Sequence, residues 1–388
     1  MRRGSPNRTG HPRLNLLIYA AITAYALGQG MTIPALPLFA YSLGATETTL
    51  GLLGTMPSIT YAGLAIRFGG LSEKRGRRAF IILGPTLYLL ISLAYMISSN
   101  LNQILAVRPL EGISFALFWP CAEAYIADLH GNIPRRRATG YYTLAWSVGT
   151  TLGPAIGGYL IDRASIGSPF AACTIVMAIS LILALISTNE MRSGRELTHD
   201  ETGGQSTSLR SILFAILGYA FSQATVFSLY PVHASMLGFT EIEIGILLSL
   251  IGITRTLIFA LFTFVRVPSG ATMATFGYFI LAMSLILMPI LNWFYASAMS
   301  FAMMGAGLGL VYISVIGLVM NHQSRGDAAG AFESGIGIGA IAGPLISGIA
   351  AEHIGSLAPY FLSSFSAITG IVFAKAATAE GPAKRVRQ

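Results

Sequence analysis

Long apolar runs, nearly free of charged side chains, recur along the whole chain. A helix that spans a bilayer needs about 20 mostly apolar residues, because its backbone polar groups must be satisfied within the segment. The first half holds six such runs: 14–41, 48–66, 79 to a polar turn at 98–103, from there to about 127, 138–161 and about 164–188. The second half holds six more: 211–232, 244–265, two within 267–324 with a turn near 291–293, about 328–351 and 354–374. This pattern predicts an all-α membrane protein with twelve transmembrane helices.

A polar, glycine-rich stretch without hydrophobic periodicity separates the two groups of runs at residues 189–208. We therefore predict an N-terminal six-helix bundle over residues 1–188, a linker over 189–210 and a C-terminal six-helix bundle over 211–388.

Composition agrees with this prediction, since 54% of the residues are hydrophobic, only 10% are charged and the mean hydropathy is +0.66. A soluble domain carries about 25% charged residues. The composition therefore excludes a water-soluble enzyme and most nucleic-acid binders.

The basic residues predict the orientation. If the N-terminus is cytoplasmic, 21 of the 24 Lys and Arg residues lie on the inner side, Arg163 lies in an outer loop, and Arg108 and Arg255 lie within spans. Cytoplasmic loops are enriched in Lys and Arg. We therefore expect a multi-pass protein of the plasma membrane with both termini and the linker in the cytoplasm, and the net charge of +8 needs no nucleic-acid partner.

A ten-residue segment of the first half returns in the second. Residues 149–158 read Gly-Thr-Thr-Leu-Gly-Pro-Ala-Ile-Gly-Gly, and residues 339–348 read Gly-Ala-Ile-Ala-Gly-Pro-Leu-Ile-Ser-Gly. The offset of 190 residues is about half the chain, so the two bundles are expected to be pseudo-symmetric copies. Small residues four apart let a neighbouring backbone approach closely, and proline loosens a helix. The predicted helix-packing residues are Gly149, Gly153, Pro154, Gly157, Gly158, Gly339, Gly343, Pro344 and Gly348.

Several spaced motifs point to one family. Residues 69–78, Gly-Gly-Leu-Ser-Glu-Lys-Arg-Gly-Arg-Arg, closely resemble the loop signature G-x-L-[SA]-[DE]-[RK]-x-G-R-[RK] of the major facilitator superfamily. Arg108-Pro-Leu-Glu-Gly112 is similar to the R-x-x-Q-G motif of that family. Residues 149–158 and Ile33-Pro-Ala-Leu-Pro37 resemble motifs of its drug and metabolite exporters. The resemblance covers essentially the whole chain and implies the major facilitator fold of two six-helix bundles.

The loop at 69–78 is a candidate gate. Its glycines are expected to permit a tight reversal. The resemblance implies that Glu73 contacts the start of span eleven, near residues 328–330, and holds the outward-facing state closed on the inside. A carboxylate is favoured at a helix N-terminus. The alternative is that its basic residues form only a positive-inside cluster. The candidate gating residues are Gly69, Glu73, Gly76, Arg77, Arg78, Glu123 and Asp128, with Glu123 and Asp128 expected to pair with Arg77 or Arg78.

Ionisable residues within spans are the candidate site, because a charge in lipid costs several kcal/mol unless it faces a cavity or a partner. Arg108 and Glu111 lie three apart on one helical face and can pair, although Arg108 could instead reach the outer surface. Arg255 lies about halfway along span eight, and Glu333 lies near the inner end of span eleven, where it could be interfacial. Candidate polar or aromatic residues of a cavity are Gln29, Tyr142, Trp146, Gln223, Tyr230 and Tyr312.

Proton coupling needs an acid within the membrane. The exporter branch often has one in span one, six positions before the first proline of its motif, but this chain has Gly28 there. Glu111 is then the best candidate, because it lies one turn from Arg108 where the family motif has an uncharged Gln. Glu333 is the reserve, and a permanent Arg108–Glu111 ion pair is the alternative.

These features together predict a secondary active transporter that works by alternating access, with proton-coupled export of small organic or hydrophobic compounds. The alternatives are proton-coupled uptake of a sugar or other metabolite and, from other classes, a polytopic membrane enzyme or a non-transporting sensor. The sequence has no G-x-x-x-x-G-K-[ST] loop, and its six histidines show no metal-ligand spacing. We therefore expect no metal and no cofactor beyond coupled protons. We also expect no enzyme activity. The protein is expected to be a monomer, and its expected partners are the lipid bilayer and a small-molecule substrate.

Overall fold

Helices dominate the computed structural model, which describes residues 12–129, 135–188, 208–264, 271–320, 322 and 324–379. The helices in this part of the chain are α1 (Pro12–Ser42), α2 (Glu47–Arg75), α3 (Arg77–Ile97), α4 (Leu101–Leu129), α5 (Arg135–Arg163), α6 (Ser168–Ser187), α7 (Leu209–Met236), α8 (Glu241–Phe264), α9 (Ala271–Leu287), α10 (Phe294–Met320), α11 (Arg325–His353) and α12 (Ala358–Ala379). Each of the twelve expected spans corresponds to one of these helices, so the all-α fold class is confirmed.

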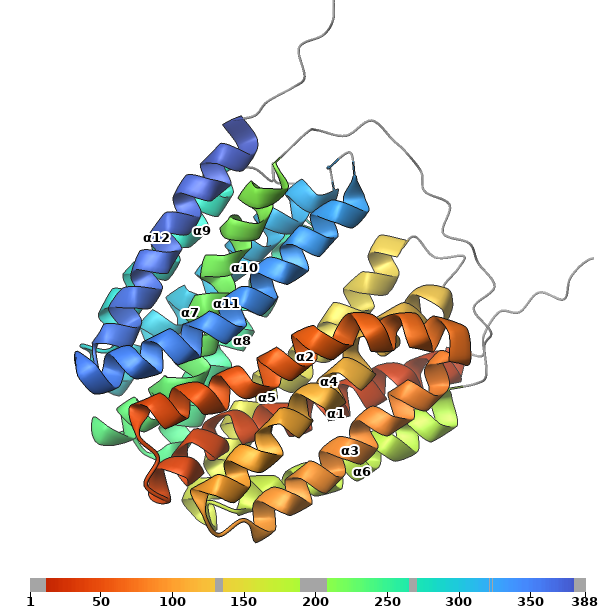
Figure 1. The fold of residues 1–388 in the computed structure, drawn as a ribbon, viewed down its shortest axis with the longest axis horizontal. Helices are drawn as coiled ribbons and strands as arrows, with labels where there is room; N and C mark the ends of the chain where they lie inside the picture. The colour runs from red at the N-terminus through yellow and green to blue at the C-terminus, as the bar shows by residue number, and fades with distance from the viewer. Residues whose placement is uncertain are drawn as a thin grey trace, which may run out of the picture.

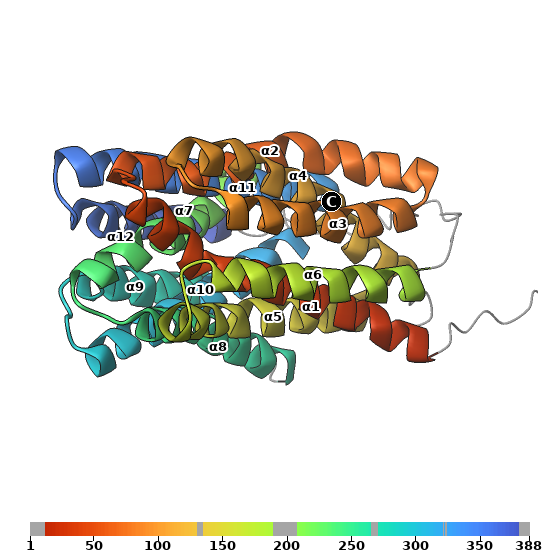
Figure 2. The ribbon, with the colours of Figure 1, turned by 90° about the horizontal axis from the view of Figure 1, so that it is seen from below.

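The helices run along one common direction, as spans of a bilayer must (Figure 2). Within the described residues, nine of them are by themselves long and apolar enough to cross a membrane. Helix α9, with its 17 residues, is shorter than the others. Helix α5 contains many glycines and hydroxyl side chains, which lower its mean hydropathy. These small residues let it pack closely against α1 and α8.

The expected loop at residues 69–78 is mostly helix, and here the sequence-based expectation was wrong. Helix α2 continues to Arg75, well past the apolar run that ends at residue 66, so Gly69 and Gly70 are helical. The chain reverses at Gly76 alone, whose φ of 94° is a conformation that residues with a Cβ rarely adopt. A charged helix end outside the lipid carries no hydropathy signal, so the apolar run underestimates the length of α2.

Within each half, the repeated glycines hold a pair of helices together. A Cβ on Gly149 of α5 would lie 2.6 Å from the Cβ of Ala26 in α1, and a Cβ on Gly339 of α11 would lie 2.9 Å from the Cβ of Ala220 in α7. A Cβ on Gly153 would lie 2.5 Å from the Cα of Gly30. The same positions thus pack α5 on α1 and α11 on α7, which is the pseudo-symmetry that the repeat predicts.

The last glycine of each repeat joins the two halves. A Cβ on Gly158 of α5 would lie 3.0 Å from the Cα of Gly245 in α8, and a Cβ on Gly348 of α11 would lie 2.9 Å from the Cα of Gly51 in α2. Both contacts lie at the end of the molecule where α2 and α8 begin and α5 and α11 finish. We call this the closed end.

Toward the opposite end the halves separate, and we call that the open end. Thr55 Oγ1 of α2 still donates to the carbonyl of Ile341 in α11, at 3.0 Å. Further along, a Cβ on Gly337 would meet only Ala62, at 3.8 Å, and one on Gly330 would meet nothing within 4 Å. Figure 1 shows the two groups of helices diverging toward the α2–α3 turn. The structure is therefore a state closed at one end and open at the other.

Candidate functional site

A cavity of about 290 Å³ lies between the halves, lined by residues of α1 to α5, α7 and α8. Six of the residues singled out from the sequence line it together: Gln29, Arg108, Glu111, Trp146, Gln223 and Arg255. The cavity lining includes neither Tyr312 nor Glu333. Helices from both halves thus bring the strongest candidates to one place.

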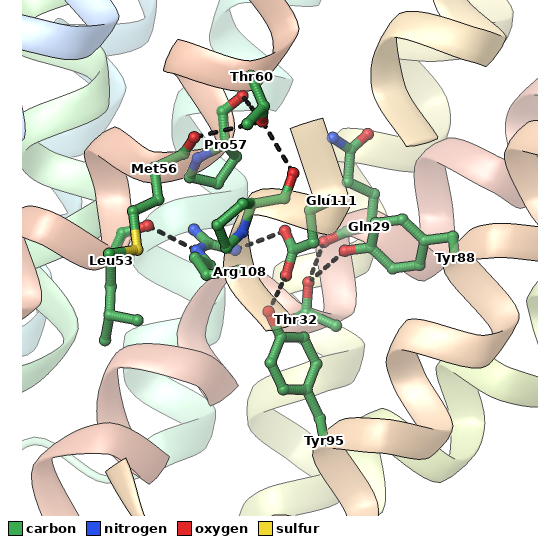
Figure 3. A network of polar contacts seen from close by, with 11 residues as sticks. Gln29, Thr32, Leu53, Met56, Pro57, Thr60, Tyr88, Tyr95, Arg108 and Glu111 are labelled. Atoms are coloured by element: carbon green, nitrogen blue, oxygen red, sulfur yellow. Dashed lines mark hydrogen bonds and ion pairs between the residues drawn. The ribbon is translucent and has the colours of Figure 1, made fainter. Parts of the chain in front are cut away.

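Arg108 and Glu111 form the centre of a buried polar network (Figure 3). Their side chains form an ion pair, with 2.5 Å between Arg108 Nη1 and Glu111 Oε2. Tyr95 Oη donates to Glu111 Oε1 at 2.6 Å. Glu111 is only 2% exposed. Arg108 therefore points into the protein toward Glu111, and not to the outer surface.

A proline in α2 explains how Arg108 is held. Arg108 Nε donates to the carbonyl of Leu53 at 2.6 Å. In a regular helix the N–H of residue 57 would occupy that carbonyl, but Pro57 has no N–H, so the carbonyl is free to accept. Gly112 of α4 makes the approach possible, since a Cβ there would lie 2.9 Å from the carbonyl carbon of Pro57. The R-x-x-E-G motif and Pro57 thus form one structural unit.

Hydroxyl groups form further hydrogen bonds beside this network, and sequence reasoning missed them. Thr32 Oγ1 donates to the carbonyl of Gln29 at 2.8 Å and shares a hydrogen bond of 3.1 Å with Tyr88 Oη. Tyr25 Oη shares one of 2.7 Å with Ser114 Oγ. Tyr and Thr are common in transmembrane helices as packing or interfacial residues, so nothing in the sequence marked these as partners.

Arg255 occupies a second buried position on the cavity. It is 3% exposed, and its guanidinium lies over the ring of Trp146, 4.9 Å from the centroid. Its Nη1 donates to Tyr219 Oη at 3.3 Å, whereas its Nε has no hydrogen-bond partner. In the described part of the chain, no ion pair joins Arg255 to a carboxylate.

The other aromatic candidates contribute to packing near the cavity. Tyr142 packs edge-on against Trp119, with 6.4 Å between centroids, and Tyr312 lies 5.8 Å from the ring of Tyr219. Tyr230 is fully buried and packs against Phe301.

The acidic candidates of the open end lie apart from this cavity. Glu123 and Glu333 are exposed and lie within electrostatic range of each other. Glu73 is exposed as well, whereas Arg77 is buried. The side chain of Asp128 lies outside the described residues. Among the described residues, no group of three or more His, Cys, Asp or Glu is placed to hold a metal ion.

Position 28, where the exporter branch often carries an acid, faces α6. A Cβ on Gly28 would lie 2.7 Å from Met177 Cε and 3.3 Å from Cys173 Sγ. Position 28 therefore packs against α6 and is not part of the cavity lining.

Comparison with known proteins gives one consistent result. The family model for the Major Facilitator Superfamily matches residues 18–332. An uncharacterised transporter of this type from Methanocaldococcus jannaschii is 24% identical over 360 residues, covering 89% of this chain and 93% of the relative. The quinolone resistance protein NorA of Staphylococcus aureus is 23% identical over 370 residues, which cover 92% of this chain and 94% of NorA. Among solved structures, a bacterial homologue of the human lysosomal transporter Spinster, in an inward-facing and occupied conformation, aligns over 97% of both chains with a TM-score of 0.71 and 18% identity.

Proposed function

Since the chain belongs to the Major Facilitator Superfamily and is therefore a membrane transporter and not an enzyme, we propose that it exports small organic compounds in exchange for protons. The observation that carries this proposal is the buried Arg108–Glu111 pair, which lines a cavity between two halves that pack together from the closed end to about the middle of their helices and separate toward the open end. The resemblance to a quinolone resistance protein supports export.

Alternating access follows from the symmetric contacts of the closed end. Gly158 with Gly245 and Gly348 with Gly51 close that end. Because the halves are pseudo-symmetric, rocking them about the cavity opens this end and brings the other ends of α2 and α11 together. The cavity is then reached from each side in turn.

Glu111 is the proposed proton site. The positive charge of Arg108 favours the carboxylate, whereas burial favours the neutral acid. A change of conformation that alters the contact with Arg108 or the access of water can therefore bind or release the proton. Glu333 is the reserve candidate, since it is an acid near the open end.

Orientation and environment are part of the same proposal. The basic α2–α3 turn lies at the open end, and the excess of Lys and Arg assigns that end to the cytoplasm. We infer a monomer in the plasma membrane with both termini cytoplasmic, without a cofactor other than the proton. The structure then represents the inward-open state.

The test is transport by the purified protein in liposomes with an imposed pH gradient and no nucleotide. Ethidium, 1-naphthoate and a neutral aromatic amide serve as probes of different charge. We expect at least one of them to be moved against its own concentration gradient, and a protonophore to stop this. Export coupled to protons is contradicted if no probe is moved uphill, or if a protonophore has no effect.

Glu73 is expected to act in the outward-open state. A carboxylate at the N-terminus of a helix contributes about 1–2 kcal/mol in a partly buried setting, or a factor of about 5 to 30 in a conformational equilibrium. Because Glu73 is exposed in the present state, Glu73→Ala should cut the transport rate by such a factor and leave thermal stability unchanged. Lys74→Ala, at the next exposed position, is the control. Normal transport by Glu73→Ala would rule out the gate.

A further inference from the structure

The ionisable side chains of the central cavity do not balance in charge. Its lining includes Arg108, Glu111 and Arg255, and no other Asp, Glu, Lys, Arg or His. The ion pair of Arg108 with Glu111 cancels two of the charges. Arg255 remains, and it is held by a neutral tyrosine and a neutral tryptophan. A buried charge without a counter-charge is costly in a medium of low dielectric constant.

The guanidinium of Arg255 is held so that it can bind a further group. The side chain is 3% exposed. Of its five N–H donors, one is used by Tyr219 Oη, and Nε lacks a partner. The guanidinium carbon lies 4.9 Å from the centroid of the Trp146 ring, which places the group beside that ring. A planar guanidinium with free donors matches a carboxylate, which accepts two parallel hydrogen bonds.

The rest of the lining is uncharged and mixes polar side chains, Gln29 and Gln223 among them, with an apolar and aromatic part that includes Phe115, Trp119 and Phe227. Its volume of about 290 Å³ is just below the range of small-molecule pockets, about 300–1,000 Å³. An occupant with one small ring system therefore fits this space better than a large drug does.

We propose that this cavity takes organic anions, with the carboxylate of the ligand paired to Arg255 and its aromatic or aliphatic body against Phe115, Trp119 and Phe227. This inference rests on the proposed function, because it takes the cavity as the transport site, and it narrows the substrate class. Phe115 and Trp119 are on α4 and Arg255 is on α8, so an anion bound in this way contacts both halves.

Binding to the purified full-length protein, measured by calorimetry, tests the proposal with three probes of nearly equal shape. 1-Naphthoate carries a negative charge, 1-naphthamide is neutral and 1-naphthylmethylammonium is positive. We expect the parent to bind 1-naphthoate at least about tenfold more tightly than either of the others. Arg255→Gln is expected to abolish this preference.

Arg163→Gln is the matched control. Arg163 also lies over a tyrosine ring, that of Tyr159 at 5.9 Å, but its side chain is 69% exposed and lies 3.5 Å from a carboxylate oxygen of Asp162. This variant should bind all three probes as the parent does. The thermal transition of Arg255→Gln shows whether this variant folds. If it does not fold, the comparison of the three probes on the parent still tests whether the cavity prefers an anion.

The proposal is overturned if the parent binds the amide or the ammonium compound as tightly as 1-naphthoate, or does not bind 1-naphthoate. These failures are separate from failure of the proposed function. Uphill transport of ethidium without a preference for 1-naphthoate would overturn only the anion site. Preferential binding of 1-naphthoate without uphill transport of any probe would overturn only the transport proposal.

Discussion

Glu111→Gln is expected to abolish proton-driven accumulation while exchange of substrate down its own gradient continues. Glutamine has nearly the same shape as the acid and can still accept from Tyr95, whose Oη lies 2.6 Å from Glu111 Oε1. It cannot carry the proton. The measurement is uphill transport in liposomes with an imposed pH gradient, compared with counterflow at equal pH on both sides.

The variant leaves Arg108 without its counter-charge, and breaking a buried ion pair costs about 3–5 kcal/mol. The double variant Arg108→Gln with Glu111→Gln removes both charges and separates this loss of stability from the loss of coupling. Glu333→Gln is the control and should keep proton-driven transport. If the gradient still drives uphill transport in Glu111→Gln but not in Glu333→Gln, the proton site is Glu333.

Gly153→Leu should destabilise the protein and abolish transport. A Cβ at this position would lie 2.5 Å from the Cα of Gly30 and 2.9 Å from the carbonyl oxygen of Leu27. These are backbone atoms, which cannot turn aside as a side chain can. Overpacking usually lowers the free energy of unfolding by about 1–3 kcal/mol. Because the clash here is with backbone, we expect a loss at the upper end of this range or larger. The thermal transition of the purified protein and its transport rate measure the effect.

Gly140→Leu is the matched control, since Gly140 is in the same helix and a Cβ there would meet nothing within 4 Å. Its thermal transition should remain close to that of the parent. If Gly153→Leu is as stable and active as the parent, α1 and α5 do not approach as closely as described.

Much of the fold could be predicted from the sequence because lipid and symmetry constrain it. Apolar length alone defined the helices, since backbone polar groups in a membrane must be satisfied within each span. The repeated Gly-Pro segment predicted that Gly153 and Gly343 lie at equivalent packing positions, and in the structure they lie against α1 and α7. The end of α2 at Arg75 was missed because charged helical turns outside the lipid leave no apolar pattern.

The candidate site could be predicted only in part. Arg108 and Glu111 are one turn apart, so their pairing follows from helical geometry. The Leu53 carbonyl and Tyr95 belong to other helices, and which faces of uniformly apolar helices meet cannot be read from hydropathy. Tyr312 and Glu333 were named as candidates from residue type and position within a span, and the helices place them off the central cavity.

The central claim is that the two halves rock about the cavity, and the most direct test is a pair of distances measured by dipolar electron spin resonance. One pair of spin labels replaces Lys74 and Ala329 at the open end, and another replaces Ser42 and His353 at the closed end, all of them exposed. Cys121 and Cys173 are replaced by serine beforehand.

The measurement is made at low and at high pH, with and without 1-naphthoate or ethidium. We expect a second population in which the distance at the open end shortens while the distance at the closed end lengthens. If both distances keep a single, unchanged distribution under all of these conditions, the halves do not exchange their contacts and the alternating-access account is wrong.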